Sequence, residues 1–359
     1  MRILLIPILL LCTSALFAQS VFDLLYAPSS TRAVAVQVTV PIDSIDAHTP
    51  NELPGTMAFT DVDGREQHLS VKVSLRGKFR RTRCSTPPLK LNFSKKELSG
   101  MGLVEHDKYK LVNSCYDDST ATDLLLKEYL AYRAYALMSP DAHFRTQLLE
   151  LTYHDAAGNL ADRTEYAFLI EDPDEMAARF DGHELDDADG LDADRYPAKA
   201  EATHALFQYF IGNADWSLAL QRNVKLVEGS DGMLTPVAYD FDFSGWVGAP
   251  YASPNRQTGQ ESIYQRVYLG YHQSDRVLRE VSRDFRSHRK EVLQLIREFD
   301  LLNKRDRDII NNFVHRFYDS MAVMSQNTGL LLYDQLRGET ATIIPPGAKA
   351  EYYRSSARP

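Results

Sequence analysis

Alternating apolar and polar positions in the first half of the chain predict β-strands. The two-residue period occurs in six short segments, namely 33–40 (AVAVQVTV), 69–77 (LSVKVSLRG), 89–93 (LKLNF), 108–113 (KYKLVN), 146–155 (TQLLELTYHD) and 163–172 (RTEYAFLIED). The turn sequence HDAAGN joins the last two as a hairpin. Successive strands with one apolar face indicate a mostly antiparallel sheet.

Apolar residues at helical spacing predict a helix at 119–138 and further helices after Pro173. These are a short one at 173–180, one at 197–216 that runs into a loop, and two amphipathic helices near the C-terminus. A hairpin with its turn at GSDG interrupts them, and the acidic stretch 182–196 does not fit a calcium-binding loop, so it is interpreted as a solvated insertion. The expected organisation is a β-rich part at 25–172, a mainly helical part with a hairpin at 173–334, and a loose tail at 335–359.

The first 18 residues have the pattern of a signal peptide, with Arg2 before an apolar run and Ala18 as a small residue for cleavage. The LLLC at 9–12 is similar to a lipoprotein signal, but Leu11 is bulky where a small residue is expected. We therefore expect cleavage near Ala18 and an exported protein. Since no other run of about 18 apolar residues occurs, we expect no membrane span.

The net charge and the cysteines bear on the binding partners and on the disulfides of the protein. The formal net charge of −9 argues against a protein that binds nucleic acids nonspecifically. After signal cleavage the chain keeps Cys84 and Cys115, and export favours a disulfide between them. Two separate buried thiols are the alternative.

Several polar residues at strand ends or in loops are candidates for chemistry. Asp215, Asn223 and Asp240 supply the oxygen ligands that magnesium prefers, and magnesium is commonly held by few protein ligands together with substrate phosphates. A lysine such as Lys90 could neutralise those phosphates, which completes the set of groups used in phosphoryl transfer. Each residue also has a structural interpretation, as a surface lysine, a turn residue or a helix cap.

These segments, in this order, resemble the spore-coat protein H (CotH) kinase-like family of atypical secreted kinases over about residues 65–300. The matching stretches are RG followed by PPLKLNF, YKLVNSCYDDSTATDLLLKEYLAY, AFLIED, NAD…RNVKL and VAYDFDFSGW. The resemblance implies an α+β, bilobal, atypical protein-kinase-like fold, with an antiparallel β-rich N-lobe and a mainly helical C-lobe. It also implies ATP and Mg²⁺ as cofactors, and a protein or other hydroxyl compound as acceptor.

The resemblance assigns a role to each candidate. Asp215 would be catalytic, Asn223 and Asp240 would bind the metal, and Asp242 would assist. The nucleotide would be bound by Lys90, Arg76, Gly77 and Glu171. One departure concerns spacing, because Asp215 and Asn223 lie eight residues apart, whereas kinases place these residues about five apart. An insertion there either returns Asn223 to its place or breaks the site.

Two other functions stay open. The first is a noncatalytic pseudokinase or scaffold protein, which would bind no nucleotide. The second is a metal-dependent glycosyltransferase, because an Asp-x-Asp pair such as Asp240 and Asp242 can hold the metal of a nucleotide sugar. The consecutive strands before residue 115 argue against the second, since that fold alternates strands and helices early in the chain.

Overall fold

The computed structural model describes residues 19–28, 32–42, 52–76, 88–115, 119–186 and 191–338. The predicted signal peptide, Gly77, Cys84 and most of the predicted tail lie outside these ranges. The predicted Cys84–Cys115 disulfide and the cleavage near Ala18 therefore stay predictions.

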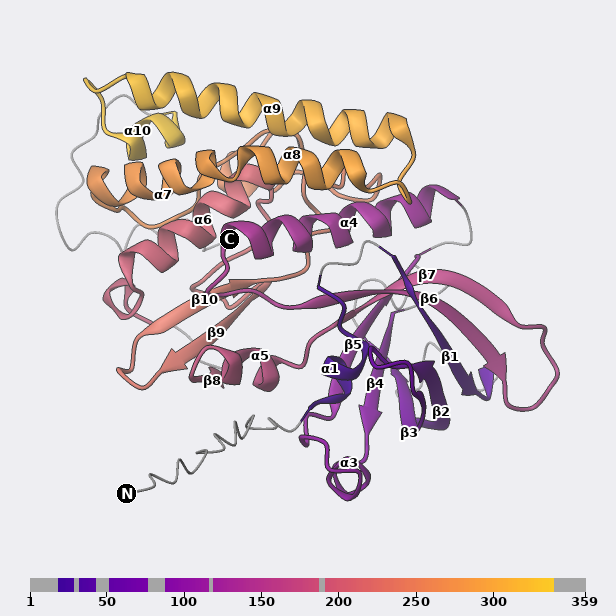
Figure 1. Ribbon diagram of the computed structural model, residues 1–359. Coiled ribbons are helices and arrows are strands. Elements are labelled where there is room, and N and C mark those ends of the chain that lie inside the picture. Colours follow the sequence, from indigo (N-terminus) through magenta and orange to yellow (C-terminus); the bar gives the residue numbers. More distant parts are fainter. Residues whose placement is uncertain are drawn as a thin grey trace, which may run out of the picture.

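Seven strands form a closed barrel in the order β1-β2-β3-β4-β5-β7-β6 (Figure 1). They are β1 (Val34–Val40), β2 (Leu53–Thr60), β3 (Glu66–Leu75), β4 (Leu89–Phe93), β5 (Lys108–Asn113), β6 (Thr146–Asp155) and β7 (Arg163–Ile170). All neighbours pair antiparallel except β1 and β6, which are parallel and place Val36 opposite Leu151. This single parallel pairing closes the barrel.

The expected bilobal kinase-like fold, with a β-rich N-lobe and a helical C-lobe, is wrong. The structure has a closed, mixed seven-stranded barrel together with helices. The reason is that a two-residue period shows which face of a strand is apolar, but not which strand it pairs with. Nothing in the local pattern of residues 33–40 indicates the parallel pairing with a segment more than 100 residues away.

The barrel has its own apolar core, and the short helix α1 (Val21–Leu25) contributes to it. Alternate residues of the strands point inward, and four apolar side chains of α1 join them. Ser20 and Asp23 cap α1 reciprocally, so this short helix begins at a defined residue. A further helix, α3 (Lys95–Gly100), follows β4.

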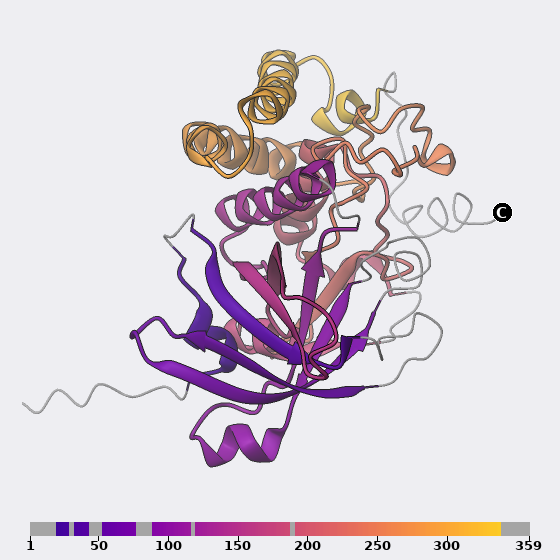
Figure 2. The ribbon, with the colours of Figure 1, turned by 90° about the vertical axis from the view of Figure 1, so that its right-hand side faces the viewer.

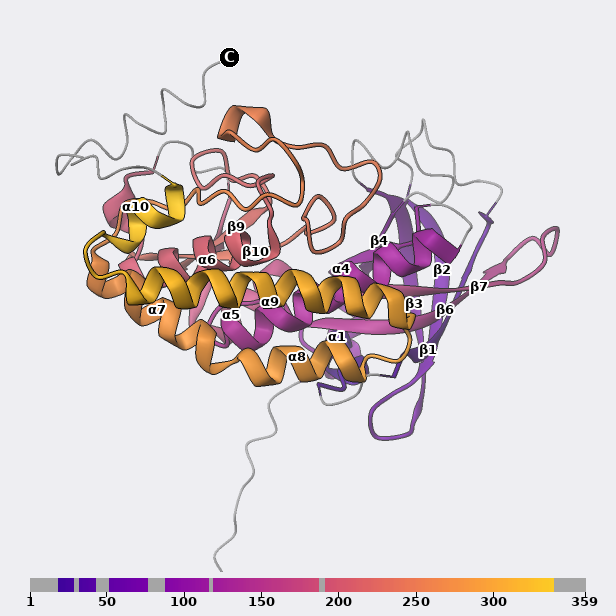
Figure 3. The same cartoon turned by 90° about the horizontal axis from the view of Figure 1, so that it is seen from above.

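The remaining helices pack around a second core that also includes one face of β6 and β7. They are α4 (Ser119–Met138), α5 (Pro173–Arg179), α6 (Ala198–Ile211), α7 (Asp275–Ser287), α8 (Arg289–Glu298), α9 (Lys304–Gln326) and α10 (Leu332–Arg337). Figure 2 shows α4 and the helices near the C-terminus above the barrel, and Figure 3 shows α7, α8 and α9 as the outer layer. Within the described residues, no helix combines the length and apolarity needed to cross a membrane.

Helix α4 lies between the barrel and the outer helices (Figure 1). It contacts β6 and β7 on one side and α6 and α8 on the other. This position explains why most of its residues are buried and why its sequence is apolar on nearly all sides. Although it precedes residue 173, α4 shares its core with the helices that follow.

A three-stranded antiparallel sheet adjoins this helical core. It consists of β8 (Gly182–Leu185), β9 (Val224–Gly229) and β10 (Leu234–Ala238), in the order β10-β9-β8. The β9–β10 hairpin was expected, but β8 falls within the stretch interpreted as a solvated insertion. At the C-terminus, α10 buries Leu332, Tyr333 and Leu336, so the predicted loose tail begins inside a packed helix.

Candidate functional site

The end of α6 directs the loop that carries Asp215. The helix stops at Gly212, whose φ of +67° lies in the left-handed region that glycine adopts without strain. The carbonyl groups of Ile211 and Gly212 then accept hydrogen bonds from the backbone of Trp246 and Gly245. The loop after α6 is therefore bound directly to the turn that follows β10.

Asp215 and Asn223 meet although eight residues separate them in the sequence. The Nδ2 of Asn223 donates to Oδ2 of Asp215 at 3.1 Å and to the backbone carbonyl of Asp215 at 2.6 Å. The residues between them fold back as a small loop, closed by two backbone hydrogen bonds between Ser217 and Arg222. This insertion returns Asn223 to Asp215.

Two tyrosines of α4 fix the backbone at Asp240. The hydroxyl of Tyr132 accepts a hydrogen bond from the Asp240 N–H at 2.8 Å, and the hydroxyl of Tyr135 accepts one from the Ala238 N–H at 3.3 Å. Residues three apart lie on the same side of a helix, so both hydroxyls reach the end of β10. The segment with Asp240 is thus held against α4.

Unusual backbone angles concentrate at this place. Among the described residues, four non-glycine residues have positive φ, and three of them are Gln221 (44°), Asn223 (54°) and Asp240 (63°). Asparagine and aspartate tolerate this region better than other side chains. Such conformations are sparsely populated and cluster at functional sites, which directs attention to this loop and turn.

The electrostatic environment of Asp215 favours its protonated form. Burial raises the pKa of the Asp215 carboxyl, and the neighbouring charge of Asp240 raises it as well. Two contacts lower this pKa, namely the Arg222 Nε at 3.4 Å from Oδ1 and the hydrogen bond from Asn223. The pKa of Asp215 stays above its usual value nevertheless. The two carboxylates, Asp215 and Asp240, therefore lie close enough to interact.

Lys110 of β5 reaches the same region from the barrel. Its Nζ lies 4.4 Å from the centre of the Tyr239 ring, and Tyr239 immediately precedes Asp240. The pKa of Lys110 is lowered to about 8, chiefly by burial and also by Arg76 and Lys225, whereas Asp240 and Glu184 act in the opposite direction. These influences place Lys110 among the charged groups around Asp240.

The predicted lysine, Lys90, occupies the neighbouring strand. Lys90 of β4 is paired in register with Lys110 of β5, so the two side chains share the outer face of the barrel. Arg76 follows β3, and its Nε lies 3.5 Å from the Leu111 carbonyl. Sequence reasoning missed Lys110, although its alternation in KYKLVN is the same signal that marked Lys90.

Lys225 of β9 adds another cation beside the site. It forms ion pairs with Glu184 and Asp186, the latter with Nζ 2.9 Å from Oδ1. Although burial lowers the pKa of Lys225, the hydrogen bonds to both carboxylates raise it overall. Lys225 was not among the predicted residues, and its nearness in sequence to Asn223 was the only available signal.

Asp242 is buried and supports a neighbouring segment. Its Oδ2 accepts a hydrogen bond from the Tyr251 hydroxyl at 3.2 Å. This contact connects the turn after β10 to the irregular segment 249–266. Asp242 is thus close in sequence to Asp240 but is engaged with a different part of the chain.

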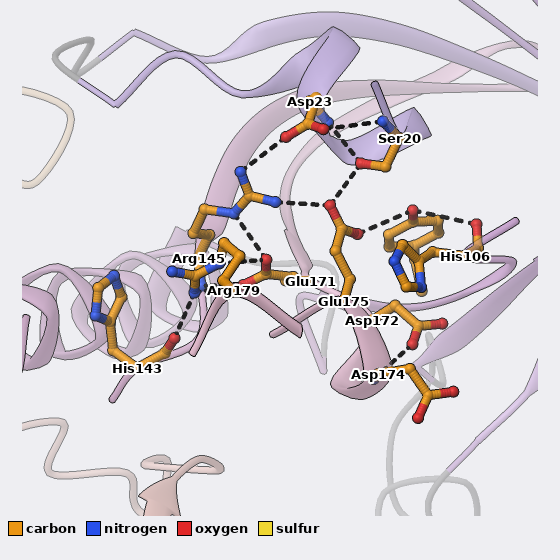
Figure 4. A network of polar contacts seen from close by, with 11 residues as sticks. Ser20, Asp23, His106, His143, Arg145, Glu171, Asp172, Asp174, Glu175 and Arg179 are labelled. Carbon is orange, nitrogen blue, oxygen red and sulfur yellow. Dashed lines mark hydrogen bonds and ion pairs between the residues drawn. The ribbon is translucent and has the colours of Figure 1, made fainter. Parts of the chain in front are cut away.

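Glu171 lies in a cluster with Arg145, Arg179 and Glu175 (Figure 4), and it is bound there by the two arginines rather than by the groups around Asp215 and Asp240. Its Oε1 accepts from Nε of Arg145 at 2.8 Å and from Nε of Arg179 at 2.7 Å. Its Oε2 accepts from the Arg145 backbone N–H and from Nη2 of Arg179, both at 2.9 Å. These four donors occupy a fully buried carboxylate, in place of the predicted contact with a nucleotide.

The same cluster connects α1 to the barrel and to α5. Arg145 also pairs with Asp23 at 2.8 Å and with Glu175 at 2.6 Å, so two arginines face three carboxylates. Burial raises the pKa of Glu175 to about 7, the Ser20 hydroxyl that donates to it lowers the pKa, and Glu171 raises it. A proton on Glu175 would balance the charge of the cluster.

Replacing Arg145 by methionine should destabilise the protein by about 3–5 kcal/mol, because it leaves Glu171 and Glu175 buried with one fewer cation. Urea unfolding of the variant measures this loss. Arg65→Met is the matched control, since Arg65 and Asp63 form an exposed pair that should contribute less than about 1 kcal/mol. Equal, small losses in both variants would show that the cluster does not hold the fold together.

The donor set at Asp215, Asn223 and Asp240 fits a hard cation only with help from a ligand. In the described ranges, no three histidine, cysteine, aspartate or glutamate side chains gather as a group able to hold a metal ion. Two carboxylates and one amide are present instead, and the Asn223 amide turns its nitrogen to Asp215, so that its Oδ1 is the end suited to a cation. This composition suits magnesium, which takes few protein ligands and completes its shell with phosphates and water.

No protein-family model matches this sequence, and no curated protein matches it.

Proposed function

We propose that the protein binds a nucleotide with magnesium and transfers a phosphoryl group from it to a hydroxyl on a protein or another acceptor. The observation that carries this proposal is the contact between Asn223 and Asp215 beside Asp240, with the half-buried Lys110 against Tyr239, the residue before Asp240. The activity agrees with the one implied by the CotH resemblance, whereas the kinase-like fold is no part of the proposal.

Asp240 and the Oδ1 of Asn223 are the groups that would hold magnesium, whereas Asp242 binds the Tyr251 hydroxyl. Bound magnesium supplies positive charge at the phosphate oxygens, where negative charge accumulates during transfer. The α4 tyrosine that binds the Asp240 backbone would keep this carboxylate in place before the nucleotide arrives. Such preorganisation avoids rearrangement at the moment of reaction.

Lys110 would bind the phosphates of the nucleotide. Because its pKa is lowered to about 8, its charge is only weakly compensated by the protein, and a phosphate oxygen would be a favourable partner. Arg76 and Lys225 add positive potential nearby, as their effect on the Lys110 pKa indicates. The protein itself therefore offers cations on one side and oxygen ligands on the other.

Asp215 would take the proton of the acceptor hydroxyl. The acceptor oxygen forms a bond to the terminal phosphorus of the nucleotide, the bond from that phosphorus to the bridging oxygen breaks, and the nucleoside diphosphate leaves. The proton goes to a carboxylate oxygen of Asp215, whose raised pKa makes it a better base than an exposed aspartate. Asn223 would orient this carboxylate through the hydrogen bond to Oδ2.

Substitution of Lys110 by methionine tests the proposal against the sequence-based choice of Lys90. Lys110→Met should weaken ATP binding in magnesium by about tenfold or more, whereas Lys90→Met should change it by a much smaller factor. In the wild type, affinity should be retained below the Lys110 pKa of about 8 and fall as the pH rises through it. Titration calorimetry at several pH values measures both effects, and a larger loss in Lys90→Met would contradict the assignment.

A further inference from the structure

Two buried amides lie directly behind Asp215. Gln208 of α6 and Asn213 of the following loop are both almost fully buried. The Nδ2 of Asn213 donates to Oε1 of Gln208 at 3.0 Å, and its Oδ1 accepts from the backbone N–H of Asp215 at 2.9 Å. A continuous set of hydrogen bonds thus runs from the last turns of α6 to the backbone of the candidate base.

The orientation of the Asn213 amide is fixed from both ends. Its oxygen must face the Asp215 N–H, because a turned amide would place two donors against each other. Its nitrogen must then face Gln208, whose Oε1 accepts the hydrogen bond. Among the described residues the Gln208 Nε2 is already buried without a partner, and turning the Asn213 amide would leave further buried donors unpaired at a cost of about 1–3 kcal/mol.

Helix capping does not require these side chains. The backbone N–H groups of Gly212 and Asn213 already bind carbonyl groups of Tyr209 and Gln208 in the last turn of α6. The Asn213 side chain reaches beyond that turn to the next loop residue. On the other side of Asp215, Asn223 donates to its backbone carbonyl. Both backbone polar groups of Asp215 are thus bound by asparagine side chains.

We propose that Gln208 and Asn213 are positioning residues. They would hold Asp215 in the geometry needed to accept the proton of the acceptor hydroxyl, and this role rests on the proposed function. Neither side chain touches a reacting atom. Gln208 fixes the Asn213 amide, the amide fixes the Asp215 backbone, and the backbone sets the direction of the carboxylate. Displacement of a catalytic group by about 1 Å can lower a rate about 100-fold, so this arrangement affects the transfer step.

The substitutions Gln208→Leu and Gln208→Glu separate this role from simple packing. Leucine removes the acceptor for Asn213 Nδ2 and leaves that nitrogen buried and unpaired. Glutamate keeps an oxygen at the same distance along the side chain. Gln147→Leu is the matched control, because Gln147 is another buried glutamine with hydrogen bonds to Ala27 and Leu148 in the barrel.

The experiment uses the full chain with terminally labelled ATP and magnesium, and with casein and water as the acceptors. Gln208→Leu should lower kcat by about tenfold or more, with KM for ATP changed by less than about twofold, because Asp240 and Lys110 are untouched. Gln208→Glu should retain most of kcat, and Gln147→Leu should lower the melting temperature without lowering kcat. Amide hydrogen exchange at Asp215 should be faster in Gln208→Leu than in the wild type.

Two results would overturn the inference, and they differ. If the wild type transfers phosphate and Gln208→Leu keeps its kcat, the positioning role is wrong and the proposed function stands. If the wild type transfers phosphate to neither acceptor, the proposed function fails and the positioning role fails with it.

Discussion

Replacement of Asp215 by asparagine should lower phosphoryl transfer by about two to four orders of magnitude while nucleotide binding stays close to wild type. Asparagine has the same size, and the hydrogen bonds of the residue 215 backbone to Asn213 and Asn223 do not depend on its side chain. The change therefore keeps these bonds and removes the carboxylate that accepts the proton, together with its ion pair to Arg222. Single-turnover transfer and equilibrium ATP binding, measured on the same samples, separate the two effects.

The pH dependence gives a second readout for Asp215. Because its folded pKa is raised, the wild-type rate should fall as the pH drops through that raised value, and Asp215→Asn should lose this acidic limb. Asp231→Asn is the control, since Asp231 is exposed in the turn between β9 and β10 and should leave the profile unchanged. An Asp215→Asn variant with wild-type transfer would exclude Asp215 as the base.

Replacement of Asp240 by asparagine should remove the dependence of nucleotide binding on magnesium. Asparagine tolerates the φ of 63° at this position, and the backbone N–H can still donate to Tyr132. The change keeps the shape and removes the charge that a hard cation needs. ATP affinity in magnesium should therefore fall to the affinity measured without it, with the melting temperature near wild type.

The same substitution at a second left-handed aspartate controls for backbone effects. Asp181 has a φ of 55° and lies just before β8, so Asp181→Asn should leave nucleotide binding unchanged. If Asp240→Asn unfolds the protein and Asp181→Asn does not, the Asp240 carboxylate is structural. The metal-binding role would then be wrong.

Many local elements of this fold could be predicted from sequence, although α1, α3, β2 and β8 were not among them, and the assembly could not be predicted. The alternation in 33–40 correctly predicts β1, yet the parallel partner of β1 lies beyond the reach of any local pattern. β2 contains Pro54 and Gly55, which weaken a strand signal, and Gly55 is accommodated there because a side chain would meet the Thr39 carbonyl. The closed barrel therefore follows from the strand pairing in the structure and could not be predicted from the local sequence patterns.

Part of the candidate site could likewise be predicted from the sequence, and part of it could not. Asp215, Asn223 and Asp240 were proposed from their order in the chain, and the structure brings these three residues to one place. Their supporting groups were not foreseeable, because Lys110 and Lys90 alternate identically and are even register partners, and only the contact of Lys110 with the Tyr239 ring distinguishes them. The Glu171 carboxylate binds two arginines that lie 26 and 8 residues away, in elements whose packing the sequence does not reveal, and its contact with a nucleotide stays a prediction.

Calorimetric titration of the wild-type protein with ATP, in millimolar magnesium and again with a chelator, tests the central claim most directly. The site formed by Asp215, Asn223, Asp240 and Lys110 predicts saturable binding in magnesium that is lost when the metal is removed. Binding of equal strength in both conditions would contradict a metal at Asp240. No binding in magnesium would contradict the nucleotide site itself.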